Sequence, residues 1–235
     1  MSVDVIIPIF NQAKYLPMAL ESCFGQGVLN KNIYVIDDGS TDNPKTICSK
    51  YKVSYLRSDS NIGPAAARNL GIKNSNSEFI AFLDADDLML PGRISFSLKK
   101  ICLTEGVMVC GNYKFLINRE RVTHQFYKNP VDITYEKMLE NNYVACGSVL
   151  LRRDVLNDIG LFNEDYNLAE DYDLWLRIAE KHKIHYIHEP LYLYSRNTIE
   201  KKSLTSNPNN LNKLVENIKK IKLESSKRKG LLNAG

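Results

Sequence analysis

The residues of this chain best suited to chemistry follow directly after an apolar run. Phe79 to Leu83 are strand-forming residues, and Asp84, Asp86 and Asp87 come next. Carboxylates this close repel one another unless a cation lies among them, and Mg²⁺ and Mn²⁺ prefer oxygen ligands. In an α/β protein, ligands gather at the carboxyl ends of strands. The acids therefore predict a metal-assisted site for a phosphorylated substrate, although a solvated turn is the alternative.

Two other expected strand ends carry polar residues that could meet these acids. The first apolar run leads into Pro8, Phe10 and Asn11, and the second leads into the acidic run Asp37 to Asp42. In a doubly wound sheet such ends converge, and acids there can accept hydrogen bonds from a ribose or a nucleobase. A plain turn and helix cap would use the same residue types. The run at 37–42 does not by itself decide between these interpretations.

Two further segments contribute a cation and more acids. Arg68 lies in a helical pattern of small residues, where its guanidinium could pair with a diphosphate or with one of the acids. Glu170 and Asp171 open a helix that carries Trp175 on its apolar face. Acids at a helix N-terminus can act simply as caps. Alternatively, one of these carboxylates is a general base that takes a proton from an attacking hydroxyl.

The elements that must position these residues alternate between strand and helix patterns. In the first half we expect strands at 3–8, 33–36, 53–56 and 79–83, and helices at 14–24, from 44 onward, 64–72 and 91–101. In the second half we expect strands at 107–110 and 112–118, a hairpin return at 121–127, and helices at 135–140, 153–158 and 170–181. The alternation indicates an α/β fold with a Rossmann-like, mostly parallel central sheet flanked by helices.

Composition excludes several classes of protein. Hydrophobic residues make up 44% and charged residues 25%, an ordinary balance for a soluble domain, and the net charge of +4 is too small to indicate nucleic acid. No apolar run reaches the roughly 18 residues of a transmembrane helix, and the first residues lack a signal-peptide pattern. Five scattered cysteines without a CxxC pair favour reduced thiols. We therefore expect a cytoplasmic location.

The last part of the chain differs from the rest in charge. The polar stretch at 206–210 is the best boundary candidate, and it separates a body at 1–205 from a basic, helical tail at 206–235. The tail pattern is amphipathic, with Leu214 and Ile218 on one face and several lysines on another. Such a helix either packs on the body or attaches to an anionic membrane surface.

The order and spacing of these motifs resemble those of the family 2 glycosyltransferases, inverting enzymes with the GT-A fold. The matching stretches are the opening strand at 4–11, DDGSTD at 37–42, N-x-G-x-x-x-A-R-N at 61–69, DxD at 84–86, and Glu170-Asp171 before D-L-W-L-R. The resemblance covers about Val3 to Tyr194. It implies a GT-A domain at 1–205, with a nucleotide-sugar-binding half at about 1–105 and an acceptor-side half at about 106–205.

The resemblance also implies roles for the candidate residues. Asp38 would hold the base of a nucleotide diphosphate-sugar, and Asp84 would approach the ribose or the sugar. Asp86 would bind Mn²⁺ or Mg²⁺ between the phosphates, and Asp171 would be the general base. The full donor-binding set would be Pro8, Phe10, Asn11, Asp38, Arg68, Asp84 and Glu170.

The chain departs from this family after its last expected core strand. Many relatives carry Y-R-x-H there, whose Arg and His can reach the metal or phosphate, whereas this chain has Tyr194-Ser195-Arg196-Asn197. Either Arg196 replaces the missing Arg from a shifted position, or Asp86, the phosphates and water suffice for the metal. We favour the second interpretation.

We therefore expect a metal-dependent inverting glycosyltransferase of bacterial polysaccharide or glycoconjugate synthesis. Its donor would be a UDP-sugar by default, and its acceptor a glycan or lipid-linked glycan at the inner face of the membrane. A sugar-phosphate nucleotidyltransferase is an alternative, but residues 8–12 lack a basic glycine-rich loop, and they also lack the G-x-G-x-x-G of a dinucleotide oxidoreductase. A binding module without catalysis is a further alternative, against which the presence of Asp86 and Asp171 argues.

Overall fold

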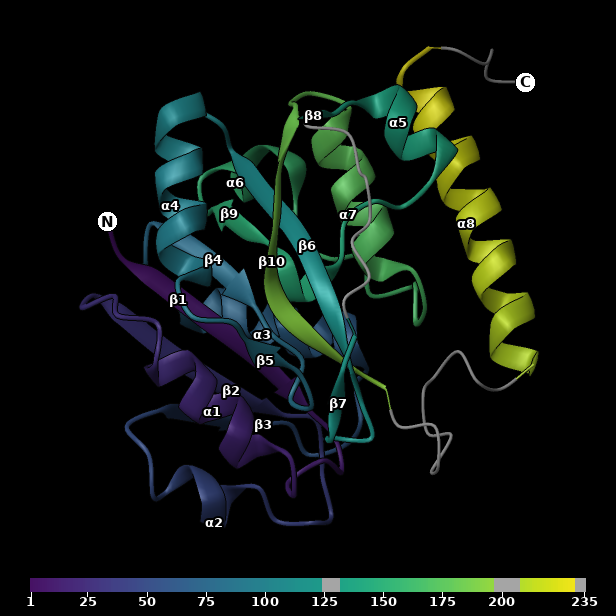
Figure 1. Cartoon of the computed structure of the whole chain (residues 1–235). Helices are drawn as coiled ribbons and strands as arrows, with labels where there is room; N and C mark the ends of the chain where they lie inside the picture. Colours follow the sequence, from purple (N-terminus) through teal and green to yellow (C-terminus); the bar gives the residue numbers. More distant parts are fainter. Residues whose placement is uncertain (124–131, 197–207, 231–235) are drawn as a thin grey trace.

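One sheet between two layers of helices makes up the computed structural model, which describes residues 1–123, 132–196 and 208–230 (Figure 1). The strands are β1 (Val3–Ile9), β2 (Lys31–Asp37), β3 (Ser54–Arg57), β4 (Phe79–Phe82), β5 (Leu88–Met89), β6 (Met108–Ile117), β7 (Arg121–Val122), β8 (Asp132–Ile133), β9 (Leu150–Arg152) and β10 (Ile184–Arg196). The helices are α1 (Leu16–Phe24), α2 (Lys45–Cys48), α3 (Pro64–Asn74), α4 (Arg93–Thr104), α5 (Tyr135–Glu140), α6 (Val155–Ile159), α7 (Glu170–Ala179) and α8 (Pro208–Arg228), with a 3-10 turn at Cys146–Ser148.

The sheet has a parallel part and a mixed part. Its strand order is β3-β2-β1-β4-β9-β6-β10-β5, with β7 beside β6 and β8 beside β10. From β3 to β4 all pairs are parallel, as expected from the strand–helix alternation. Beyond β4 the short β9 runs antiparallel to both β4 and β6, whereas β10 runs parallel to β6. The carboxyl ends of β1, β2 and β4 therefore share one edge of the sheet.

Side-chain alternation along β1 divides the core into two clusters. Val5 and Ile7 are buried in the cluster formed with α1 and α4, whereas Ile6 is buried in the cluster formed with α3 and α7. All positions of β4 are buried, as a strand covered on both faces requires. The α/β fold predicted from the sequence is confirmed in this arrangement.

The segment 107–118 contains one strand, β6 (Met108–Ile117), where two were expected. β6 continues through Gly111, because this glycine lets the neighbouring strand pack closely. A Cβ at Gly111 would lie 2.4 Å from the Leu191 side chain on β10. The expected hairpin return is present as β7, while the rest of that segment, and the boundary expected near 206, lie outside the described residues.

The basic tail contains α8, which packs along α7 at one side of the molecule (Figure 1). Ile221 is fully buried there, and the Tyr166 hydroxyl donates a hydrogen bond to Glu224 at 3.0 Å. Arg228 forms an ion pair with Glu180 at 2.7 Å. Part of the amphipathic pattern is therefore satisfied by the body of the protein. Within the described ranges, no helix has both the length and the apolar character needed to cross a bilayer.

Candidate active site

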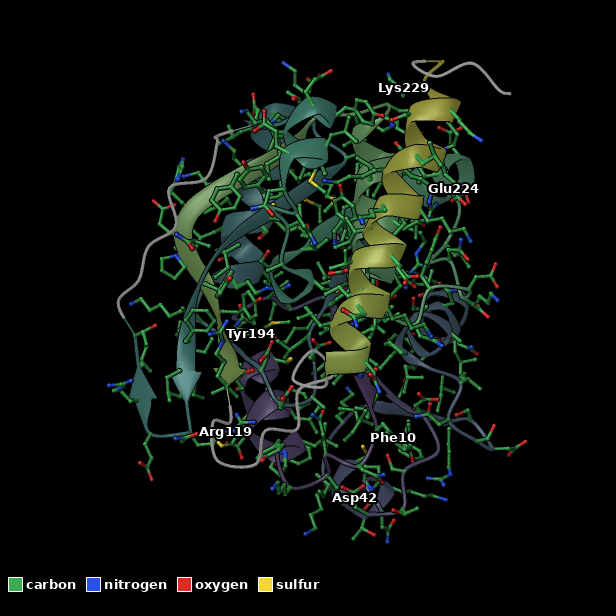
Figure 2. All side chains as sticks on the ribbon, turned by 90° about the vertical axis from the view of Figure 1, so that its right-hand side faces the viewer. Phe10, Asp42, Arg119, Tyr194, Glu224 and Lys229 are labelled. Atoms are coloured by element: carbon green, nitrogen blue, oxygen red, sulfur yellow. The ribbon has the colours of Figure 1, made fainter. Side chains whose placement is uncertain are left out.

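The segments after β1 and β2 are joined by hydrogen bonds at the carboxyl edge of the sheet. Asn11 donates its backbone N–H to the Ser40 hydroxyl at 3.0 Å, and its side-chain oxygen accepts from the Thr41 N–H at 2.8 Å. The Asp42 carboxylate accepts from the Ala13 N–H at 2.7 Å. Phe10 and Asp42 accordingly lie at the same end of the molecule (Figure 2). These contacts give Asn11 and Asp42 a role in fixing two loops against each other.

Asp38 shapes the segment that leads into α3. Its two carboxylate oxygens accept from the N–H of Ile62 at 2.6 Å and of Gly63 at 3.0 Å, and the residue is only 4% exposed. Gly39 beside it has φ +76°, and a Cβ there would lie 2.7 Å from the Ser60 carbonyl carbon. The turn therefore requires glycine for both conformation and space. The Ser58 hydroxyl also donates to Asp38, at 3.4 Å, and since a carboxylate has about four acceptor sites, one could still bind a base N–H.

Arg68 connects two acidic motifs that are far apart in the sequence. It is buried on α3 and donates from Nη1 to Glu170 at 2.7 Å and from Nη2 to Asp84 at 2.9 Å. Both pairs are charge-assisted, and such hydrogen bonds are among the strong ones in proteins. The structure thus brings the end of β4 and the start of α7 to a single place.

The three acids after β4 have different surroundings. Asp84 is paired with Arg68 and its side chain is 37% exposed. Asp87 is buried and accepts from the Ser195 N–H of β10 at 2.7 Å, while the Ser195 hydroxyl donates to the Asp86 carbonyl oxygen. The turn is therefore held between β4 and β10. Asp87 therefore serves this turn as a structural acid.

Asp86 is the acid of this turn that suits a metal ion. Burial, together with the negative charge of Asp84, raises the pKa of Asp86 to about 6. Nearby cations and hydrogen-bond donors therefore do not fully offset the cost of ionising this carboxyl. Among the described residues Asp86 forms no ion pair, and no group of three or more His, Cys, Asp or Glu side chains is placed to hold a metal. Mg²⁺ commonly binds through one or two carboxylates plus substrate phosphates, and Asp86 fits such a site.

Glu170 and Asp171 at the start of α7 also differ from each other. Glu170 is neutralised by Arg68, whereas Asp171 forms no ion pair within the described ranges and accepts the N–H of Tyr172 at 2.7 Å. Burial, and then the charge of Glu170, raises the pKa of Asp171 to about 7. A carboxylate with this pKa is well suited to take a proton near neutral pH, because general bases work best when their pKa is close to the working pH.

Comparison with known proteins now identifies the family. The sequence model described as glycosyl transferase family 2 matches residues 4–160. The chain belongs to this family. It is 31% identical over 203 residues to an uncharacterized glycosyltransferase of Rickettsia typhi, covering 80% of this chain and 62% of that protein. It therefore spans about three fifths of the length of that relative.

Other relatives and solved structures agree. The chain is 29% identical over 208 residues to the Escherichia coli UDP-Glc:alpha-D-GlcNAc-diphosphoundecaprenol beta-1,3-glucosyltransferase WfgD, covering 87% of this chain and 80% of WfgD. The structure of Staphylococcus aureus TarS superposes with a TM-score of 0.73 at 22% identity, covering 93% of this chain and 39% of TarS. TarS in complex with UDP gives a TM-score of 0.72 at 23% identity, over 93% of this chain and 64% of TarS 1-349. The expected GT-A fold is confirmed.

Aromatic residues beside the acids of this family 2 chain were not singled out from the sequence. The rings of Tyr113 on β6 and Tyr194 on β10 lie 5.9 Å apart, and Phe115 lies 5.9 Å from Tyr194. The Arg196 guanidinium lies 3.9 Å from the centre of the Phe115 ring. Aromatic residues at alternate positions of two strands were the available signal, but their proximity depends on the β6–β10 pairing.

Proposed function

We propose that the protein is a metal-dependent inverting glycosyltransferase that moves a sugar from a nucleotide diphosphate-sugar to an acceptor hydroxyl. The observation that carries this proposal is the double ion pair of Arg68, which joins the turn of Asp86 to the helix start of Asp171. A candidate metal ligand and a candidate base thus belong to one site. Membership of glycosyl transferase family 2 supports the same reaction class.

In the proposed reaction, Asp171 accepts the proton of the acceptor hydroxyl while that oxygen attacks the anomeric carbon. The new carbon–oxygen bond forms on the face opposite the bond to phosphate, which breaks with its electron pair leaving on the nucleoside diphosphate. One displacement inverts the configuration. Asp38, with Pro8, Phe10 and Asn11, would bind the nucleoside. A divalent ion on Asp86, Mn²⁺ or Mg²⁺, would supply Lewis-acid stabilisation of the diphosphate when bound.

The donor is proposed to be a UDP-sugar and the acceptor a lipid-linked glycan in bacterial glycoconjugate synthesis. WfgD is named for UDP-Glc and for a diphosphoundecaprenol-linked acceptor, and TarS has been solved with UDP and with UDP-GlcNAc. These names support a uridine donor and a lipid acceptor by analogy within the fold and family. We assign the acceptor to the half of the body at about 106–205.

Titration of UDP by calorimetry tests the donor site. We expect Mn²⁺ to tighten UDP binding, and Asp86→Ala to weaken binding about tenfold or more in Mn²⁺ but not in EDTA. Asp59→Ala, which removes an exposed acid after β3, is the control and is expected to bind UDP normally. Unchanged affinity in Asp86→Ala would remove this residue as a ligand. A separate assay distinguishes glycosyl transfer from the nucleotidyltransferase alternative. A glycosyltransferase releases UDP from a UDP-sugar when no pyrophosphate is added, whereas a nucleotidyltransferase needs pyrophosphate to cleave the UDP-sugar.

We also propose that α8 contacts the anionic inner face of the cell membrane. Leu211, Val215 and Leu223 are each about half exposed on α8, and their four- and eight-residue spacing places Lys219 among them on one helical face. Exposed apolar residues interleaved with lysine are typical of interfacial helices. The face packed on the body remains in place in this arrangement.

Vesicle sedimentation tests this contact with the full chain. We expect binding to vesicles of phosphatidylglycerol, little binding to phosphatidylcholine, and at least severalfold less binding after Leu211, Val215 and Leu223 are all changed to serine. Because these residues do not contact the core, the variant should unfold at the same temperature as the wild type. Equal sedimentation of the two proteins would refute the proposal.

A further inference from the structure

The hairpin between β6 and β7 holds an arginine in a fixed position near the acids. Its turn residues Asn118 and Arg119 have φ of 49° and 66°, which lie in the left-handed region. The Glu120 N–H closes the turn on the Ile117 carbonyl oxygen at 3.1 Å, and the Asn118 N–H bonds the Arg196 carbonyl oxygen at 2.9 Å. Because arginine is uncommon in this conformation, its surroundings must hold the turn.

The two terminal nitrogens of Arg119, Nη1 and Nη2, are buried and have no hydrogen-bond acceptor in the described part of the chain. The guanidinium lies 4.3 Å from the centre of the Tyr15 ring. Buried donors without acceptors cost free energy, and native structures rarely keep them without a reason. Two such donors on one planar fork call for a ligand that accepts both.

Arg119 lies at the end of the molecule where we propose that the donor phosphates bind. It lies close enough to Asp86 and Asp87 for its charge to act on both carboxylates. It nevertheless forms no ion pair with either carboxylate in the described structure. Figure 2 shows Arg119 at the same end of the molecule as Phe10 and Asp42.

Other arginines near the acids differ from Arg119 in their pairing or their exposure. Arg68 donates to Asp84 and Glu170, and Arg196 is exposed to solvent with its guanidinium over Phe115. Arg119, by contrast, presents two unpaired donors at a spacing that matches two phosphate oxygens.

We propose that Arg119 donates hydrogen bonds to the diphosphate of the donor and stabilises the nucleoside diphosphate as it leaves. The inference rests on the proposed function, because it needs a nucleoside diphosphate at this site. Tyr15, on which the guanidinium stacks, positions Arg119 for that contact. Arg119 thereby becomes a substrate-binding residue that no motif of the sequence indicated.

Binding measurements on Arg119 variants test the contact directly. The wild type is first titrated with UDP, GDP, ADP, CDP and dTDP in Mg²⁺, and the best ligand is compared with its parent nucleoside by ligand-observed NMR. Arg119→Ala is expected to bind the diphosphate about tenfold or more weakly and the nucleoside with unchanged affinity. Arg119→Lys keeps the charge and should recover part of the loss. Arg121→Ala removes an exposed arginine of the same hairpin and is expected to match the wild type.

The possible outcomes separate this inference from the proposed function. If the wild type binds none of the five diphosphates, both fail. If it binds one of them and Arg119→Ala binds equally well, only the role of Arg119 is refuted. Equal losses for the diphosphate and the nucleoside would show that Arg119 merely supports the fold of the site, as would a comparable loss in Arg121→Ala. Arg119→Lys provides the same comparison if the alanine variant does not fold.

Discussion

Asp171→Asn is expected to lower kcat by about 100-fold or more while UDP affinity stays within about twofold of the wild type. Asparagine can still accept the Tyr172 N–H through its side-chain oxygen, so the start of α7 should keep its structure. It cannot accept a proton from the acceptor hydroxyl. Release of UDP from a UDP-sugar with acceptor gives kcat, and calorimetry with UDP gives the affinity. Full activity would exclude Asp171 as the base.

A matched control and a pH profile separate this role from a general effect of charge. Asp165→Asn removes an exposed acid in the loop before α7 and should leave kcat unchanged. In the wild type, burial and Glu170 raise the pKa of Asp171 to about 7, so kcat should fall about tenfold per pH unit below that value as the base is protonated. A flat profile between pH 5 and 8 would contradict the assignment.

The same raised pKa affects stability with a definite sign. The folded state holds the Asp171 proton more tightly than the unfolded chain does, so the stability of the fold decreases as the pH rises toward about 7. Asp171→Asn removes a buried charge that exists above this pH. The variant should therefore melt at a higher temperature than the wild type at pH 8, and the difference should be smaller at pH 5.

The parts of the site that could be predicted from the sequence are those encoded locally. The apolar runs before residues 8–11, 37–42 and 84–87 identify strands, and parallel pairing then requires their ends to meet. The partners of Arg68 could not be predicted in this way. These partners, Glu170 and Asp84, lie 102 and 16 positions away, and the sequence allowed a phosphate or either acid to pair with Arg68.

The second half of the chain was harder to predict because its contacts depend on non-local pairing. Asn118 favours a left-handed turn, but nothing local indicates that Arg119 would stack on Tyr15 from α1's N-terminal side. Likewise, the amphipathic pattern of α8 predicts a helix without indicating which face packs on α7. Ile221 is buried there and Leu223 is not, although both are apolar.

The ion pairs of Arg68 lead to the largest stability effect that we expect. Arg68→Met should lower the free energy of unfolding by about 3–5 kcal/mol, because it leaves the buried Glu170 and the adjoining Asp84 without their cation. Urea unfolding followed by circular dichroism measures the change. Arg152→Met makes the same substitution at a surface pair with Asp154 and should cost less than about 1 kcal/mol.

A second substitution distinguishes loss of charge balance from loss of packing. If Arg68 stabilises the fold mainly by neutralising acids, Glu170→Gln should recover a large part of the loss in the Arg68→Met background, although alone it is destabilising. If the long side chain matters chiefly for packing against Phe162, whose ring centre lies 5.6 Å from the guanidinium, the two effects should simply add. If the double variant recovers stability but not glycosyl transfer activity, Arg68 is needed to place the acids as well as to neutralise their charge. The same cation would then account for both the fold of the site and the position of its base.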